Sequence, residues 1–303
     1  MGGSGGYSGY GSISACPPVA SSINDSQSSQ REMEINDFLE ALLKEINNRD
    51  VTAINTHLAE IEKSLGKDID GIEKILFGGS ISKSTFIEGT SDVDALVVLD
   101  SNAYFKKRPE ELQDAFVTLL RKRFPKTEIT KGKLAVTVKF GDYEIQLLPA
   151  LRDGAKIRIA DGSKDTWSSP INIKQFTTRL TAINKMNANK VIPVIKLAKK
   201  LFSNFPEQHQ LSGYHIEAMA AELFSTYSGR NTLYDMTKYF LDASAKRVLR
   251  PISDITGQSH LIDSELGSVN SIHRQQISHH IKDIAGRFSG SDAVFVAKEL
   301  FGG

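Results

Sequence analysis

The spacing of apolar residues predicts the first elements of the chain. Apolar positions recur at helical intervals over residues 35–46 and again over 54–65, which predicts two helices. A short apolar run at 75–77 predicts a strand. A second run, rich in valine and leucine, predicts a buried strand at 92–99.

The pattern then changes from strands to helices. Pro109 occupies a position that opens a helix, which we expect to stop before Pro125. Alternating apolar and polar residues predict a hairpin from 134–138 and 143–148, with its turn at Gly141. From residue 173 onward the pattern is almost wholly helical. Helices are expected at 173–187, 190–203, 212–226 and 231–243, with a last pair between 270 and 301. This order predicts an α+β fold, with a mixed-sheet core at 31–165 and a helical domain at 166–303.

Composition adds a third region at the start of the chain. The segment 1–30 is rich in glycine and serine, and such a sequence buries too little apolar area to offset the entropy of ordering. We expect a disordered tail there. The 303 residues as a whole are 40% hydrophobic and 24% charged, which is ordinary for a globular protein.

Charge and cysteine content exclude several classes of protein. The chain has 37 Lys and Arg against 36 Asp and Glu, and this balance makes duplex nucleic acid an unlikely partner. The only cysteine is Cys16, so a disulfide framework and a multi-cysteine zinc site are excluded. We find no transmembrane run and no signal peptide, and we expect a cytoplasmic protein without membrane attachment.

One short constellation carries the chemistry. Gly79-Ser80 follows the short strand, and eleven residues later Asp92 and Asp94 lie on the buried strand. Residues i and i+2 of a strand face the same side, so the two carboxylates project together, about 7 Å apart. Like charges on an apolar strand repel and are costly to desolvate. A divalent cation held between them relieves both costs, and their oxygen atoms suit magnesium.

The glycine and serine point to a phosphate. Glycine at a strand-to-helix turn lets a phosphate approach the backbone, whose N–H groups and serine hydroxyl can donate to it. Alone, Gly-Gly-Ser is usually a plain turn, and Asp-x-Asp is usually a solvated strand end. Joined at this spacing, each on its expected element, they favour a site for a nucleoside triphosphate with Mg²⁺ or Mn²⁺.

These motifs resemble the signature of the DNA polymerase β-type nucleotidyltransferases. Within that superfamily, the chain resembles the bacterial cGAS/DncV-like nucleotidyltransferases, or CD-NTases, which are relatives of cyclic GMP-AMP synthase. Further support comes from the segments EIQLLPA at 144–150, VIKLAK at 194–199 and SGYHIE at 212–217. The resemblance spans about residues 35 to 290. It implies a nucleotidyltransferase core followed by a helical domain, with substrates entering a cleft between two lobes.

The resemblance also implies an activity and a biological setting. A ribose hydroxyl would attack the α-phosphate of a nucleoside triphosphate, pyrophosphate would leave, and a second round would close a ring. Two metal ions would stabilise the attacking and leaving oxygens. The expected product is a cyclic di- or trinucleotide second messenger made from ATP and other nucleoside triphosphates in the antiphage system CBASS. A downstream effector would bind that product rather than this protein.

Family roles can be assigned residue by residue. Asp92 and Asp94 match the metal-binding acids, and Gly79 and Ser80 match the phosphate loop. Further nucleotide-binding positions are assigned by the same resemblance to Lys196, Lys199, Ser212 and Tyr214. Without it, the two lysines could form a solvated helix face, and Tyr214 could belong to the core.

The histidines of the helical half have simpler interpretations. We expect His215 to be a satisfied buried histidine. His279 and His280 lie on a polar helix with no acidic partner at ligand spacing, which favours a surface position.

The third acidic position departs from the family pattern. Alignment of the strand that ends in Pro149-Ala150 places Gln146 where the family usually has an acid. An amide can coordinate a metal but cannot accept a proton from the attacking hydroxyl. Glu144, two residues earlier on the same strand face, is a candidate substitute. Three interpretations stay open: a working enzyme, a slow enzyme that needs an activator, or a nucleotide-binding homologue with weak catalysis.

The end of the chain has two interpretations. Gly302-Gly303 is common at a frayed helix end. In some CBASS operons an E1/E2-like partner conjugates the CD-NTase through its C-terminus, and a terminal Gly303 suits such chemistry. The zinc-binding insertion of cyclic GMP-AMP synthase is excluded by the single cysteine.

Two other functions remain open at this point. One is a template-free nucleotidyltransferase acting on an RNA 3′ end, which would need a basic channel that the near-neutral charge disfavours. The other is a nucleotide-binding scaffold with weak catalysis, which Gln146 supports.

Overall fold

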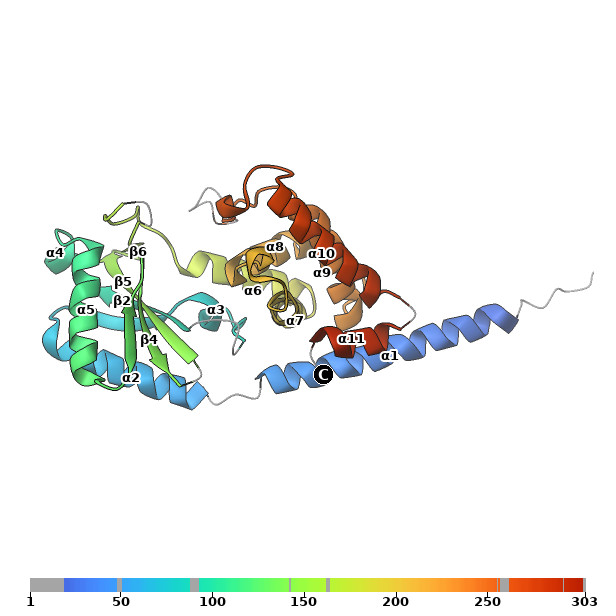
Figure 1. The fold of residues 1–303 in the computed structure, drawn as a ribbon, viewed down its shortest axis with the longest axis horizontal. Helices are drawn as coiled ribbons and strands as arrows, with labels where there is room; N and C mark the ends of the chain where they lie inside the picture. The colour runs from blue at the N-terminus through green and yellow to red at the C-terminus, as the bar shows by residue number, and fades with distance from the viewer. Residues whose placement is uncertain are drawn as a thin grey trace, which may run out of the picture.

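The structure is a computed structural model that describes residues 19–47, 51–87, 93–141, 143–161, 164–254, 256, 262–290 and 292–301. Two lobes are evident in Figure 1: a sheet lobe formed by the first half of the chain after α1, and a helical lobe formed by the second half. This arrangement confirms the predicted α+β class with a mixed sheet. Asp92 and Gly303 lie outside the described residues.

A six-stranded mixed sheet forms the first lobe. Its strands run in the order β1-β2-β5-β4-β3, and β6 pairs with the second half of β5. Only the β2–β5 pair is parallel among the strand pairs described. The strands are β1 (Ile72–Phe77), β2 (Val93–Leu99), β3 (Glu128–Lys131), β4 (Val136–Phe140), β5 (Tyr143–Asp153) and β6 (Lys156–Ile159).

Helices cover one face of this sheet. Helix α2 (Val51–Asp68) and helix α5 (Pro109–Arg123) pack on the face that carries Val93, Ala95 and Val97, and together they form one apolar core. The short helix α4 (Ser101–Tyr104) precedes α5. The opposite face carries Asp94, Leu96 and Val98, because side chains alternate along a strand. That face is where the candidate site lies.

The helical lobe has its own larger apolar core. Three of its helices begin at a Ser or Thr whose hydroxyl accepts an N–H from the first turn: Ser212, Thr232 and Ser271. Its helices are α1 (Val19–Asn47), α6 (Lys174–Met186), α7 (Val191–Phe202), α8 (Gly213–Phe224), α9 (Leu233–Arg247), α10 (Ile272–Phe288) and α11 (Ala293–Phe301). Two 3₁₀ turns, η1 (Glu207–His209) and η2 (Ser264–Leu266), join them.

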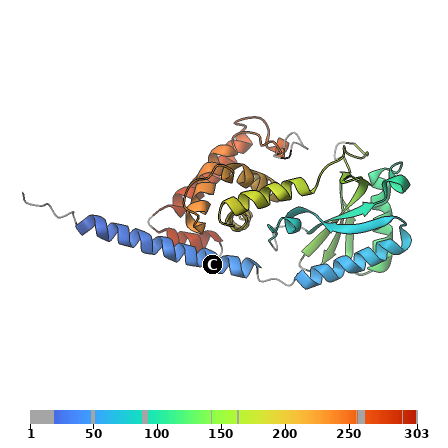
Figure 2. The same cartoon turned by 180° about the vertical axis from the view of Figure 1, so that it is seen from behind.

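The structure corrects two expectations about the start of the chain. Helix α1 begins at Val19, so the expected disordered tail of 1–30 is too long, and residues 1–18 lie outside the described part. Ile35, Leu39 and Leu43 of α1 are buried in the core of the helical lobe, and α1 packs along α11 and α9 (Figure 2). The sheet lobe therefore begins with α2 rather than at residue 31.

Strands β3 and β6 were missed by the sequence analysis because each is only four residues long and has a single buried residue. Among the helices that the structure describes, none has an apolar stretch long enough to cross a bilayer.

Candidate active site

The predicted strand-to-helix turn is confirmed at the end of β1. Helix α3 (Gly79–Ser82) begins directly after Gly78, whose N–H donates to the carbonyl oxygen of Asp94 at 2.8 Å. Gly79 has a φ of +47°, and a Cβ atom there would lie 1.7 Å from Asp94 Oδ2. Any other residue at this position would collide with the carboxylate, so the glycine holds the turn against Asp94.

Ser80 presents an unused hydroxyl beside this contact. The residue is only 7% exposed, and within the described part of the chain its Oγ has no hydrogen-bond partner. Buried polar atoms nearly always have a partner, so an orphaned hydroxyl in a turn of this kind indicates a site completed by a ligand.

The strand register places Gln146, which occupies the third acidic position of the family, beside Asp94. Asp94 lies opposite Gln146 in the parallel β2–β5 pair, and Gln146 lies opposite Thr137 of β4. Glu144 is on the same face two residues away, where its Oε1 lies 3.9 Å from Lys139 Nζ. Gln146 is therefore the neighbour of Asp94, whereas Glu144 is displaced along β5 and has its own cation.

A buried ion cluster lies between the phosphate loop and the helical lobe. Lys199 Nζ of α7 is 2.7 Å from Glu217 Oε1 of α8, and the two side chains are 3% and 1% exposed. Lys83, just after α3, forms an ion pair with the other oxygen of Glu217. Thr85 donates its hydroxyl to Glu217, and its carbonyl oxygen accepts from Lys199 at 3.1 Å. The sheet lobe and the helical lobe are thus joined at Glu217.

Burial and charge act in opposite directions on this cluster. Burial lowers the pKa of Lys199, and the attraction of Glu217 only partly counters it. Burial alone would raise the pKa of Glu217, but Lys199 and Lys83 hold it below its ordinary value. Glu217 is therefore ionised. Its negative charge stabilises the ammonium groups of Lys83 and Lys199, which have little contact with solvent.

Aromatic rings complete this region. The Lys83 ammonium lies 5.1 Å from the ring centre of Tyr214 and 5.2 Å from that of Phe176, within the range of a cation–π contact. The Tyr214 hydroxyl donates to Asp254 Oδ1 at 3.1 Å. Burial, followed by the Asp254 carboxylate, raises the pKa of Tyr214, so the phenol stays protonated.

The predicted nucleotide-binding residues therefore separate into two groups. Lys199 and Tyr214 lie with Lys83 beside the phosphate loop. Ser212 is exposed, and its Oγ accepts the N–H of His215 at 3.1 Å as the cap of α8. Lys196 donates to Asn47 of α1.

The histidines differ from their predictions in two respects. His215 is 1% exposed, as expected, but it is not satisfied: its Nε2 lies 3.7 Å from Asp263 Oδ2 and has no hydrogen-bond partner among the described residues. His279 is exposed, also as expected. The prediction that His280 lies at the surface is wrong, because this residue is half-buried. The 3₁₀ turn η1 folds against α10, and His280 Nε2 lies 3.0 Å from His209 Nδ1.

Comparison with known families decides the relationship. The model of the Second Messenger Oligonucleotide or Dinucleotide Synthetase domain matches residues 33–184, half of the chain. The chain belongs to this CD-NTase family. It is accordingly a nucleotidyltransferase, as the motifs predicted. A sequence comparison with curated proteins gives no match.

Solved structures of CD-NTases share the fold at low sequence identity. CdnC of Escherichia coli MS115-1, solved with ATP, is 18% identical, with a TM-score of 0.58 over 84% of this chain and 91% of that one. CdnG of Bradyrhizobium diazoefficiens, in complex with GTP, is 10% identical, with a TM-score of 0.63 over 82% and 91%. The cyclic AMP-GMP synthase DncV of Vibrio cholerae is 13% identical, with a TM-score of 0.59 over 94% and 91%.

Three residues of this region were not predicted to act: Phe176, Asp254 and the central Glu217. Glu217 had a sequence signal, because it is an acidic residue flanked by Ile216, Ala218 and Met219 on a buried helix. Such a residue needs a cation. Lys199 is 18 positions away on α7, whereas Lys83 comes from the sheet lobe, far away in the sequence. Periodicity alone does not reveal that pairing.

Proposed function

We propose that the protein makes a cyclic di- or trinucleotide second messenger from nucleoside triphosphates, in a reaction that depends on a divalent metal ion. The observation that carries this proposal is the orphaned hydroxyl of Ser80 beside Gly79, with Gly79 packed on Asp94 and Asp94 opposite Gln146. ATP and GTP are the first candidate substrates, since CdnC and CdnG relatives were solved with them.

The donor set fits Mg²⁺ or Mn²⁺. Asp94 supplies a carboxylate at the phosphate loop and Gln146 a carbonyl oxygen on the adjacent strand, and hard oxygen donors are the ligands Mg²⁺ prefers. Asp92 and Asp94 would hold the metal. Once bound, the metal supplies charge that stabilises the attacking and leaving oxygens.

The residues of this chain bind and orient the triphosphate. Ser80 would donate its hydroxyl to a phosphate oxygen in a position where water is excluded. Lys83 and Lys199 bring two positive charges against the single negative charge of Glu217, which leaves this cluster attractive to a polyanion. The ring of Tyr214 would stack on a base. Lys196 and Ser212 would contact phosphate only after leaving their partners in this structure.

Gln146 sets the expected rate. Its amide can accept a hydrogen bond or coordinate a metal, but it takes no proton from the attacking hydroxyl. Replacing Gln146 with Asp restores a carboxylate next to Asp94 and should increase turnover. A nucleotide-binding scaffold is the alternative function that this residue favours, because such a protein would bind ATP with no release of pyrophosphate.

The family supports a proposal for the biological setting. We propose an antiphage signalling role in CBASS, a cytoplasmic location, and an effector that binds the product. Conjugation at Gly303 by an E1/E2-like partner belongs to the same proposal.

One experiment tests the activity. The purified protein is incubated with all four nucleoside triphosphates and Mg²⁺ or Mn²⁺, treated with phosphatase, and analysed by mass spectrometry. We expect a phosphatase-resistant cyclic oligonucleotide from the wild type and roughly 10³-fold less from Asp94→Asn, the loss expected when several kcal/mol of transition-state stabilisation is removed. Product from Gln146→Asp alone would identify a site silenced by the amide. If neither protein makes product while both bind ATP, two possibilities remain: a synthase that lacks its activator, or the nucleotide-binding scaffold.

A further inference from the structure

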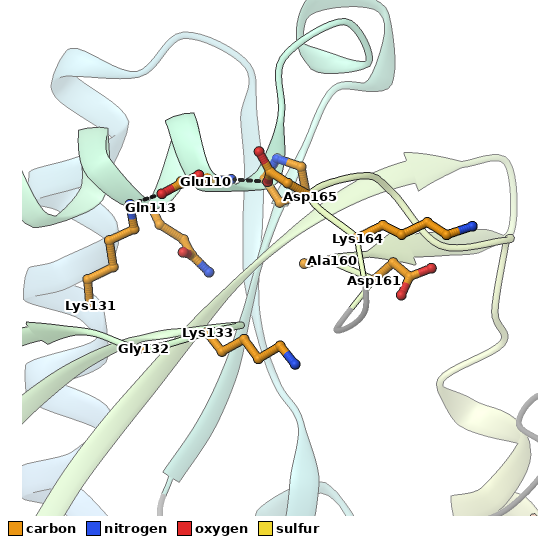
Figure 3. A pocket seen from close by; sticks show the side chains of 10 residues that line it. Glu110, Gln113, Lys131, Gly132, Lys133, Ala160, Asp161, Lys164 and Asp165 are labelled. Carbon is orange, nitrogen blue, oxygen red and sulfur yellow. Dashed lines mark hydrogen bonds and ion pairs between the residues drawn. The ribbon is translucent and has the colours of Figure 1, made fainter.

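A cavity lies in the sheet lobe, away from the phosphate loop. On one edge of β5, pairing with β4 ends at Leu147 and pairing with β6 begins at Ala150, which leaves a notch between the two strands. The turn before β4 and the loop after β6 face each other across this notch, and the first turns of α5 cover it (Figure 3). The cavity has a volume of about 310 Å³, and none of its lining residues belongs to the candidate active site.

A buried amide is directed into this cavity. Gln113 of α5 is 2% exposed, and its Nε2 has no hydrogen-bond partner among the described residues. Figure 3 shows its side chain extending from α5 into the space between the β3–β4 turn and the loop after β6. Leaving a buried donor unpaired is destabilising, whereas a leucine of similar size would carry no such cost. The amide therefore has the properties of a group that a ligand completes.

The residues that line the cavity carry balanced charge, three lysines against Glu110, Asp161 and Asp165, but their ion pairs are unevenly distributed. Lys131 is already ion-paired: its Nζ lies 3.0 Å from Glu110 Oε1 and 2.6 Å from Asp114 Oδ1. Lys133 and Lys164, on opposite walls, have no ion pair in the part of the chain that the structure describes.

One of the two carboxylates on the opposite wall is already paired, because Asp165 Oδ2 lies 3.0 Å from Arg108 Nη1. Asp161 is the other carboxylate on that wall, and it faces a lining that includes the two ammonium groups of Lys133 and Lys164. A buried amide donor together with these two lysines at the rim matches a negatively charged oxygen acceptor.

We propose that this cavity is a second ligand site, which binds a small molecule through a carboxylate or phosphate group. The oxyanion accepts the N–H of Gln113 and faces the ammonium groups of Lys133 and Lys164. The rest of the molecule occupies the remaining volume, which is at the lower end of the range for small-molecule sites. The site is independent of the nucleotide site and of any product made there.

The single tryptophan of the chain reports on this site. Trp167 forms a β-bridge with Ala160, a cavity residue, and donates its Nε1–H to the Lys107 carbonyl oxygen at 2.8 Å. Trp167 fluorescence of the full chain would be titrated with inorganic phosphate and, separately, with succinate. We expect a saturable change with at least one of them, and the probe that acts distinguishes a phosphate ligand from a carboxylate ligand.

Variants separate this site from others that bind phosphate. Gln113→Leu should weaken the response at least about tenfold, and the pair Lys133→Gln with Lys164→Gln about three- to tenfold. Lys63→Gln with Lys126→Gln removes the same charge from exposed positions elsewhere and should leave the response unchanged. Ser80→Ala, in the phosphate loop, should also leave it unchanged.

Three results would overturn the proposal. The first is a response that persists in Gln113→Leu, and the second is no saturable response to either probe up to about 10 mM, a weak limit for binding. The third concerns folding. Without ligand, Gln113→Leu should melt at the same temperature as the wild type or higher, because it removes an unpaired buried donor. A clearly lower melting temperature would make the amide a structural group.

Discussion

One buried ion cluster lies within the helical lobe and another joins that lobe to the sheet lobe, and the two have similar ion pairs but different partners. Lys199 and Glu217 approach to 2.7 Å, and so do Arg274 and Asp263, with all four side chains nearly inaccessible. Arg274 gives its other donors to backbone carbonyl oxygens of Val248, Gly267 and Asp263. All of these partners of Arg274 lie within the helical lobe.

The Glu217 cluster draws its partners from both lobes. Lys83 and Thr85 belong to the segment that follows the phosphate loop, and Lys199 belongs to α7. Lysine is also a compact charge whose pKa shifts on burial, whereas arginine stays charged. The cluster of Arg274 and Asp263, the fixed cluster, uses arginine and backbone oxygens, whereas the cluster of Glu217 uses lysines, which a triphosphate bound as proposed above would compete for.

Breaking the fixed cluster should have the largest effect. Arg274→Met leaves the carboxylate of Asp263 buried without its cation, so we expect a loss of about 3–5 kcal/mol in the free energy of unfolding. Urea denaturation of the wild type and the variant measures it. A loss below about 1 kcal/mol would contradict a self-contained structural role for Arg274.

The histidine beside that cluster should make folding sensitive to acid. Burial, with Arg274 and Arg247 adding to it and Asp263 opposing it, lowers the pKa of His215 to about 4. The unfolded chain then binds the proton more readily, so stability is intact above about pH 6.5 and falls as the pH decreases toward 4, by about 1.4 kcal/mol per unit. We expect His215→Leu to reduce this slope in unfolding measurements between pH 7 and pH 5. An unchanged slope would assign the acid sensitivity to other groups.

The sequence predicted most of the fold and only part of these clusters. Long amphipathic helices and the buried β2 were predicted because their own residues show the pattern. Helix α1 was assigned to the wrong lobe, since an apolar stripe such as Ile35, Leu39 and Leu43 does not say which core it joins. Glycine and serine at the phosphate loop were predicted because their chemistry is local.

Pairing across the lobes could not be predicted from local pattern. Thr85 and Glu217 are 132 positions apart, and only the folded chain shows that they meet. Gln146 was assigned to the third acidic position through the family resemblance, and the strand register of the folded chain places it opposite Asp94.

The cluster shared by the lobes should respond through nucleotide binding. Glu217→Gln removes the attraction that counters the burial of Lys199, so the pKa of Lys199 falls further and its charge is lost at a lower pH. We expect the KM for ATP to rise with pH between 6 and 9 in the variant, by about tenfold, and to stay nearly flat in the wild type. Arg274→Lys, in the fixed cluster, serves as the control and should leave the wild-type pH profile unchanged.

Restoring the third carboxylate should have the smallest effect. Gln146→Asp places an acid beside Asp94, and positioned proton acceptors contribute about 10²–10⁴-fold at best. Mutual repulsion of adjacent carboxylates reduces that gain, so we expect about a tenfold higher kcat. An unchanged kcat with normal ATP binding would mean that proton removal from the attacking hydroxyl does not limit turnover.

Affinity for a nucleotide that cannot react tests the account most directly. Calorimetric titration with α,β-methylene-ATP and Mg²⁺ would compare the wild type with Ser80→Ala and Lys199→Met. We predict that each substitution weakens binding about tenfold or more, because each removes a buried donor to a phosphate oxygen. Unchanged affinity in both folded variants would contradict the account, because the nucleotide would then bind away from the junction of Ser80, Lys199 and Glu217.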